Sequence, residues 1–170
     1  MKKITALLVV MLGTLPALAG DYGHKTASGW FDLENCSFCK TMTADPELLP
    51  HCRWETLPTA DGMVNVIAVD PAYAASLTKA CSDMDQLATR LQRGDVRAED
   101  LHLCGYCKAY MELMSAGARP EPIKGMATEV TLVHATDPAL IEKMHMIAKR
   151  NAVEMAGMMS STQVAGSHKR

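Results

Sequence analysis

The feature that most constrains this chain is a repeated order of short motifs. The first half contains Cys36-Ser-Phe-Cys39-Lys40, Gly62-Met63 and Asp70-Pro71-Ala72, and the second contains Cys104-Gly-Tyr-Cys107-Lys108, Gly125-Met126 and Asp137-Pro138-Ala139. From the first cysteine to the Asp-Pro pair there are 34 residues in the first half and 33 in the second. Because order and spacing both match, the sequence predicts a unit of about 68 residues that occurs twice.

Each unit predicts a helix that carries the CxxC motif, a β-hairpin and a second helix. In the first unit we expect a helix over 30–43 and strands over 53–57 and 63–69, joined by a turn at 59–62. In the second unit we expect a helix from Ala98 to Gly117 and strands over 122–124 and 129–134. The second helices begin at Asp70 and Asp137, which are typical N-caps followed by proline at the first helical position.

These elements predict an α+β fold made of tandem αββα repeats. A single hairpin is marginally stable in water, so the two hairpins are expected to join in one four-stranded antiparallel sheet packed with helices. A pseudo-twofold between the repeats would bring the two CxxC helices together. The expected organisation is a signal peptide over 1–19, a first repeat over 20–94, a second repeat over 95–159 and a disordered tail over 160–170.

The N-terminal segment is typical of a signal for export. Lys2 and Lys3 precede an apolar run over 4–12, and Ala17-Leu18-Ala19 supplies the small-x-small pattern that a signal peptidase cleaves. The run is too short to span a bilayer, and no later segment is long and apolar enough to do so. The sequence therefore predicts a secreted protein with a cleaved signal, which we assign to the periplasm.

Charge and missing motifs exclude several classes of function. The chain has 17 basic and 19 acidic residues and no basic patch with interleaved aromatic residues, so nucleic acid is not an expected partner. It has no glycine-rich phosphate loop, no HExxH and no GxSxG. The expected partners are a metal ion or an envelope protein, and the assignment leans away from an enzyme.

The two CxxC motifs carry the main functional hypothesis, which is metal binding. Cysteines at positions i and i+3 lie on one face of a helix, and four thiolates suit Zn²⁺ or Cu(I). The candidate ligands are Cys36, Cys39, Cys104 and Cys107. Met42 and Met111 are candidate thioether ligands because they follow the motifs at near-helical spacing, in a chain with 13 methionines. Methionines at such spacing also commonly fill a core.

The local setting of the two motifs is expected to differ. Asp32 or Asn35 is a candidate cap for the first motif, which would place its thiols in the positive field of a helix N-terminus. The second motif is expected deeper inside its helix, where that field is weaker. His102 precedes Cys104 by two residues and is a candidate for the same site.

Three alternatives remain open at this point. The CxxC pairs are also compatible with a thiol–disulfide oxidoreductase, although no βαβ unit of the thioredoxin type surrounds them. They are equally compatible with a disulfide-braced interaction domain. Covalent haem attachment requires CxxCH, whereas both motifs here read CxxCK.

The two remaining cysteines, Cys52 and Cys81, have no equivalents in the second unit. A disulfide between them is the expected pairing in an oxidising compartment. The alternative assigns Cys52, together with His51, to a metal site.

Overall fold

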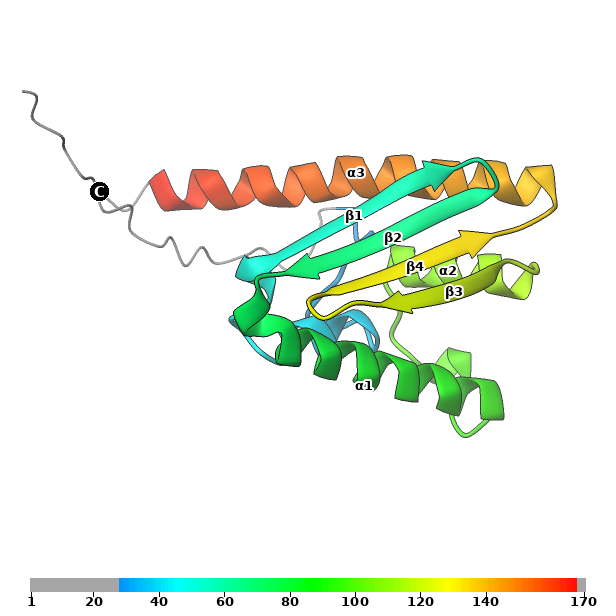
Figure 1. Cartoon of the computed structure of the whole chain (residues 1–170), viewed down its shortest axis with the longest axis horizontal. Helices are drawn as coiled ribbons and strands as arrows, with labels where there is room; N and C mark the ends of the chain where they lie inside the picture. The colour runs from blue at the N-terminus through cyan, green and yellow to red at the C-terminus, as the bar shows by residue number, and fades with distance from the viewer. Residues whose placement is uncertain (1–27, 168–170) are drawn as a thin grey trace, which may run out of the picture.

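The computed structural model describes residues 28–167, and the side chains of its last helix as far as Met158. The predicted signal peptide over 1–19 lies outside these residues, as do positions 168–170 of the predicted tail. The described chain forms one four-stranded antiparallel sheet with helices packed against it, which confirms the predicted α+β class (Figure 1). None of the helices in this part of the chain is long and apolar enough for a membrane span.

Both predicted hairpins are present. β1 spans Cys52–Thr59 and pairs with β2, which spans Gly62–Val69. β3 spans Arg119–Lys124 and pairs with β4, which spans Thr128–His134. The β-branched residues of β2 and β4 suit an extended chain that packs on a pleated surface.

The two hairpins join through their second strands, so the sheet order is β1-β2-β4-β3. Val66 of β2 lies opposite Val130 of β4 in this central pair. The half that carries the first CxxC motif and the half that carries the second thus share one sheet. The strand order is compatible with a duplicated unit, while the repeat and its pseudo-twofold stay predictions.

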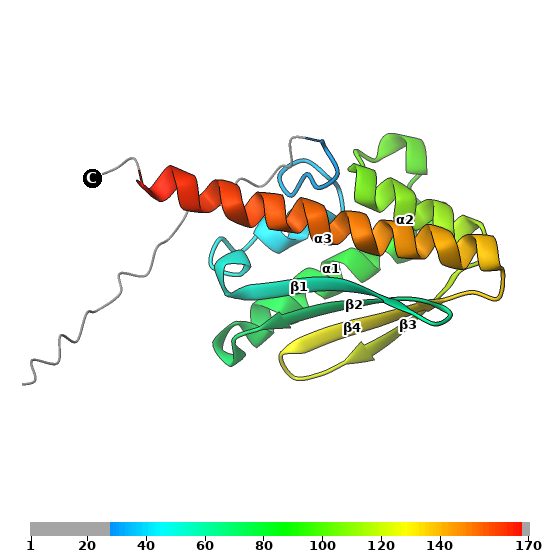
Figure 2. The ribbon, with the colours of Figure 1, turned by 90° about the horizontal axis from the view of Figure 1, so that it is seen from above.

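Three helices lie on one side of the sheet (Figure 2). α1 spans Ala74–Arg93 after a 3-10 turn at Pro71–Tyr73, and it ends at Gly94, whose φ of 77° is the left-handed conformation that glycine adopts readily. α2 spans Gly105–Ser115 and α3 spans Pro138–Ser167. α3 therefore includes residues 160–167, which we expected in a disordered tail; no proline interrupts this stretch.

The two predicted N-caps behave differently. The Asp137 carboxylate accepts a hydrogen bond of 2.9 Å from the backbone N–H of Ala139, as an N-cap does. The Asp70 side chain makes no cap and instead lies 2.8 Å from His51 Nδ1.

The predicted first helix over 30–43 is the main error of secondary structure. Residues 28–38 run as turns, and only Cys39–Thr43 form a short 3-10 helix, η1. The segment bends because the carboxylate of Asp32 accepts a 3.0 Å hydrogen bond from the backbone N–H of Asn35, a local bond that competes with a helix.

The helix expected from Ala98 is also shorter than predicted. A 3-10 turn over Ala98–Asp100 ends at Leu101, which is extended, and α2 begins only at Gly105. The CxxC motif that we expected deep in a helix therefore lies at a helix N-terminus.

The core has two parts. The larger one surrounds the four CxxC cysteines and contains Trp30, Phe31, Tyr106, Leu113 and Met144 among its buried residues. The smaller one lies against α1 and contains Met42, Leu48, Val69, Leu77, Ala80 and Cys81. The larger part holds the candidate site.

Candidate metal centre

The four cysteines of the motifs come from two short segments. Cys36 lies in the turns that precede η1, and Cys39 is the first residue of η1. The next 3-10 turn, η2, spans Leu49–His51. Cys104 is the N-cap residue of α2, and Cys107 lies in its first turn. The two segments are 65 to 71 residues apart in sequence where their thiols meet, so only the tertiary structure brings them together.

Backbone hydrogen bonds hold the two segments side by side. The carbonyls of Gly29 and Trp30 accept bonds of 3.1 and 2.9 Å from the N–H groups of Gly105 and Tyr106. These N–H groups belong to the first turn of α2 and have no partner within the helix. The N–H of Ser37 donates a 2.7 Å bond to the carbonyl of His102. The segment that carries the first motif thereby caps the helix that carries the second.

Gly105 is required for this close approach. A Cβ atom at this position would lie 2.9 Å from Trp30 Cε3 and 3.2 Å from Trp30 Cα. Both distances are shorter than ordinary van der Waals contacts. The glycine inside the second CxxC motif is therefore explained by the chain that packs against it rather than by its own backbone angles.

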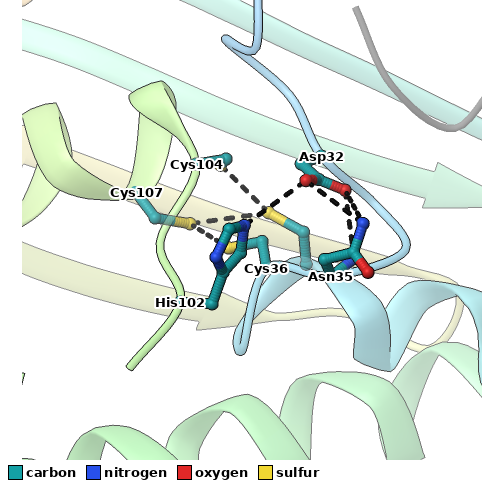
Figure 3. A network of polar contacts seen from close by, with 7 residues as sticks. Asp32, Asn35, Cys36, His102, Cys104 and Cys107 are labelled. Carbon is teal, nitrogen blue, oxygen red and sulfur yellow. Dashed lines mark hydrogen bonds and ion pairs between the residues drawn. The ribbon is translucent and has the colours of Figure 1, made fainter. Parts of the chain in front are cut away.

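The four sulfur atoms form one compact group. Cys36 Sγ and Cys39 Sγ each lie 3.5 Å from Cys107 Sγ, and Cys39 Sγ lies 3.7 Å from Cys104 Sγ. All four sulfur atoms are within 4.8 Å of one another, and all four residues are buried. Figure 3 shows the thiols of the loop segment facing those of the start of α2.

These distances match a tetrahedral metal site and not a disulfide. The edge of a tetrahedron is about 1.63 times the distance from centre to corner, so a metal–sulfur bond of about 2.3 Å gives sulfur–sulfur distances of about 3.8 Å. A disulfide requires about 2.05 Å. None of the six cysteines, which all lie in the described part of the chain, is in a disulfide. The four thiols could hold one metal ion.

The two motifs close the same local turn. The N–H of Lys40 donates to the carbonyl of Cys36, and the N–H of Lys108 donates to the carbonyl of Cys104, both at 3.0 Å. The backbone N–H of the second cysteine in each motif also donates to the sulfur of the first, which lowers the pKa of Cys36 and of Cys104. Each motif therefore offers one thiolate that its own backbone already stabilises.

Contacts among the four thiols lower the pKa of two of them and raise the pKa of the other two. Contacts with the Cys104 and Cys107 side chains hold the pKa of Cys36 far below its usual range, and the contact with Cys107 lowers the pKa of Cys104 to about 7. The contact with Cys104 raises the pKa of Cys39 and of Cys107, and burial raises both further. Without a cation, four thiolate charges at this spacing would repel one another strongly.

A buried carboxylate, that of Asp32, lies in the same loop segment as Cys36. Asp32 is only 3% exposed, and its carboxylate accepts bonds of 3.0 and 3.1 Å from the backbone and side-chain nitrogens of Asn35. His102 Nε2 lies 3.4 Å from Asp32 Oδ2, and the N–H of Cys36 donates to the Asp32 carbonyl (Figure 3). Asp32 therefore orders the loop that presents Cys36, while His102 is largely exposed above it.

The two candidate methionine ligands are placed elsewhere. Met42 is buried in the smaller core against α1, with Leu48 and Leu77 as neighbours. Met111 is half-buried and lines a surface depression of about 560 Å³ between α2 and α3. Their assignment as metal ligands stays a prediction.

Cys52 and Cys81 also lie apart from the four thiols. Both belong to the smaller core, and they are unbonded but near enough for Cys52 to act electrostatically on Cys81. Burial raises the pKa of Cys52 to about 11 and that of Cys81 to about 12. Their pairing in a disulfide stays a prediction.

Sequence reasoning did not identify the buried polar chain that supports this core. Trp30 Nε1 donates a 2.6 Å bond to Asn151 Oδ1, and Asn151 Nδ2 donates a 2.9 Å bond to Thr56 Oγ1. Thr56 and Tyr106 both donate to Asn65 Oδ1. An asparagine in the apolar run of a strand, as at position 65, is the signal that could have indicated such a network.

Comparisons with known proteins give no further guide to function. The chain matches no protein-family model, no curated protein and no solved structure.

Proposed function

We propose that this protein binds one soft metal ion through Cys36, Cys39, Cys104 and Cys107, with Zn²⁺ the favoured ion and Cu(I) the alternative. The observation that carries the proposal is the group of four buried thiols, in which three sulfur–sulfur distances are 3.5 to 3.7 Å and all sulfur atoms lie within 4.8 Å of one another. Tetrahedral S₄ sites are typical of zinc. The positions of Met42 and Met111 away from the thiols favour Zn²⁺ over a Cu(I) site that includes thioethers.

Closure of the site favours a structural role over metal transport. The four cysteines are between 0% and 8% exposed, and four protein ligands leave no open coordination position. The ion would connect the loop segment to α2, in addition to the backbone hydrogen bonds and ring contacts that join them. We therefore favour a metal-stabilised scaffold over a carrier or a sensor.

The same burial argues against the rival hypothesis of a dithiol oxidoreductase. Thiol–disulfide exchange requires a thiolate that a partner can reach. In the periplasm, where we place the protein, a bound ion would also protect the four thiols from oxidation by occupying their lone pairs.

The test is the metal content of protein purified from the periplasm without chelator or reductant, by native mass spectrometry and elemental analysis. We expect one zinc per chain and four thiols that resist alkylation until the protein is denatured. The same sample, sequenced from its N-terminus, tests cleavage after Ala19. Finding disulfides in place of metal would overturn the proposal and favour a braced interaction domain or a redox protein.

A matched pair of variants assigns the ligands. Cys107→Ser removes a proposed ligand, and Cys81→Ser removes a buried thiol outside the site. Structural zinc contributes about 10–16 kcal/mol of binding free energy in small domains, so one ligand in four accounts for about 3–4 kcal/mol, or ~100- to 1000-fold in affinity. We expect this loss in Cys107→Ser alone, and equal losses in both variants would refute the assignment.

A further inference from the structure

The sheet has one face that no helix of residues 28–167 covers. Thr56 and Asn65 bond toward Asn151 of α3, and Met63 and Val133 are buried, so these positions face the helices. Side chains alternate along a strand, and the residues between them therefore face the other way. Within the described chain, all three helices lie on one side of the sheet, and Figure 2 shows the other side bare.

This uncovered face is aliphatic at its centre. Leu57, Val64 and Leu132 form one row across β1, β2 and β4, and Val66, Val130 and Ile123 form the next across β2, β4 and β3. Leu57 and Ile123 are each 48% exposed, which places them among the most exposed large apolar side chains of the described chain. A sheet with one face in water normally carries polar residues there, so the six side chains indicate a contact surface, which we call the open sheet face.

Charged residues occur only at the margin of the open sheet face. Arg53 and Glu55 lie on the β1 side and form an ion pair of 2.8 Å, and Glu121 lies on the β3 side. An apolar centre with a polar rim of both signs is the usual composition of a protein–protein interface.

The edges of the sheet are protected in a way that its face is not. Pro58 lies in β1, and Pro120 and Pro122 lie in β3. Proline has no N–H to offer a further strand, and edge prolines are a common device against edge-to-edge association. Association through the edges is thus blocked, while the face remains available.

We propose that the open sheet face is the interface of a symmetric homodimer, in which two copies of this chain pack face to face. A two-fold contact requires a surface that complements itself. An uncharged aliphatic centre meets its own copy without burying an unpaired charge, and sheet-on-sheet packing is a standard way to bury such a face.

The available area is sufficient for such a dimer. Four strands at a spacing of about 4.8 Å and eight residues at about 3.4 Å each give a face of about 19 by 27 Å, or about 500 Å². Two copies bury about 1,000 Å², which reaches the lower limit for a specific interface. The dimer is therefore expected to be weak, with dissociation in the micromolar range.

The experiment is sedimentation of the metal-loaded full chain over a concentration range that spans micromolar, for the wild type and for Ile123→Glu and Leu57→Glu. Both residues are half exposed, so the variants are expected to fold and to keep their metal. Each substitution places a charge in the apolar contact twice per dimer, and we expect each to raise the dissociation constant at least about 10-fold and the double variant about 100-fold.

Val153→Glu is the matched control, because Val153 is 67% exposed on α3, away from the open sheet face. It is expected to dimerise as the wild type does. Val66→Thr, which changes one methyl group to a hydroxyl at the centre of the face, provides a milder variant and is expected to weaken the dimer with an unchanged fold. A wild type that stays monomeric overturns the proposal and leaves the face to a different partner. A dimer that persists in the double variant overturns it as well.

Discussion

The two CxxC motifs share one local turn but are held by different structures. In both, the N–H of the following lysine bonds to the carbonyl of the first cysteine, Cys36 or Cys104, at 3.0 Å. The second motif opens α2, a helix of 11 residues, whereas the first lies in turns and a 3-10 helix of five residues. The sequence CxxCK thus specifies a turn, and the surroundings decide whether a helix follows.

The two regions are therefore expected to respond differently to loss of the proposed metal ion. α2 packs against α3 and retains its own hydrogen bonds without the thiols. The loop segment over 28–43 has little helical structure of its own and depends on long-range contacts: the thiols, backbone bonds to the start of α2, the bond from Trp30 to Asn151 and the burial of Phe31 and Met42. The first region is therefore expected to lose its structure before the second.

Metal removal is expected to produce the largest difference between the two segments. With a chelator, we expect the backbone amides of the segment over 28–43 to lose most of their protection against hydrogen exchange, while those of α2 keep theirs. The reason is that binding free energy at a structural metal site is folding free energy. Hydrogen exchange followed by mass spectrometry measures both segments at once. Equal loss of protection in the two segments would contradict the expected asymmetry.

Gly105→Ala is expected to disturb the contact between the loop segment and α2 without removing a proposed ligand. The new Cβ would lie 2.9 Å from Trp30 Cε3, so the loop segment must move. We expect a loss of about 1–3 kcal/mol in the free energy of unfolding, as for other overpacked positions, together with weaker metal binding.

Gly157→Ala is the control for that prediction, because a Cβ at this helical glycine of α3 has nothing within 4 Å. It should be neutral or stabilising by up to about 1 kcal/mol. Chemical denaturation of the metal-loaded protein compares the two variants, and similar effects would show that the contact with Trp30 does not matter.

Asp32→Ala tests the loop that has no counterpart in the second region. Removal of the carboxylate takes away the acceptor of the N–H and side-chain amide of Asn35, which is exposed to water, and we expect a cost of about 0.5–1.5 kcal/mol. Thermal unfolding and the rate of metal release to a chelator measure the effect. His102→Ala serves as the control: His102 is largely exposed, so a loss as large as that of Asp32→Ala would assign the effect to the ion pair instead.

The smallest effect is expected from the two thiols that belong to neither motif. Burial raises the pKa of Cys52 to about 11 and that of Cys81 to about 12, from an ordinary value near 9.0. Above pH 9 the unfolded chain loses these protons first, so folding stability should fall between about pH 9 and pH 12.

Replacing both residues with alanine should flatten this alkaline loss relative to the wild type under reducing conditions, whatever the variant's stability at neutral pH. Denaturation at a series of pH values provides the measurement. An unchanged slope would mean that other groups cause the loss.

The hairpins and the start of α3 could be predicted from the sequence because they depend on local patterns. The turn at Gly62 and the β-branched runs predicted the hairpins, and Pro138 after Asp137 predicted the start of α3. The spacing of the two CxxC motifs indicated four candidate ligands, which lie together in the structure. These signals involve neighbours within a few positions, where backbone geometry and hydrogen bonding act directly.

The structure of the two segments that carry the CxxC motifs could not be predicted in this way. The segment over 30–43 has helical spacing but bends at Asp32, and the helix predicted from Ala98 starts instead at Gly105. Both outcomes depend on bonds between these two segments, in which Gly29 and Trp30 supply the carbonyls that cap α2. A long-range partner of this kind leaves no periodic pattern for local reasoning to detect.

The CxxC spacing in the sequence was sufficient to indicate four candidate metal ligands, because paired thiols at this spacing can share one ion. The sequence by itself also determined the α+β class, because the hairpins and their helices follow from local patterns. Only the tertiary structure decided that the four sulfur atoms meet within 4.8 Å while Met42 packs elsewhere. Backbone bonds between the two segments and the packing of the larger core, which includes Trp30, Met63 and Val133, position these segments, and the arrangement of the four thiols follows from that packing.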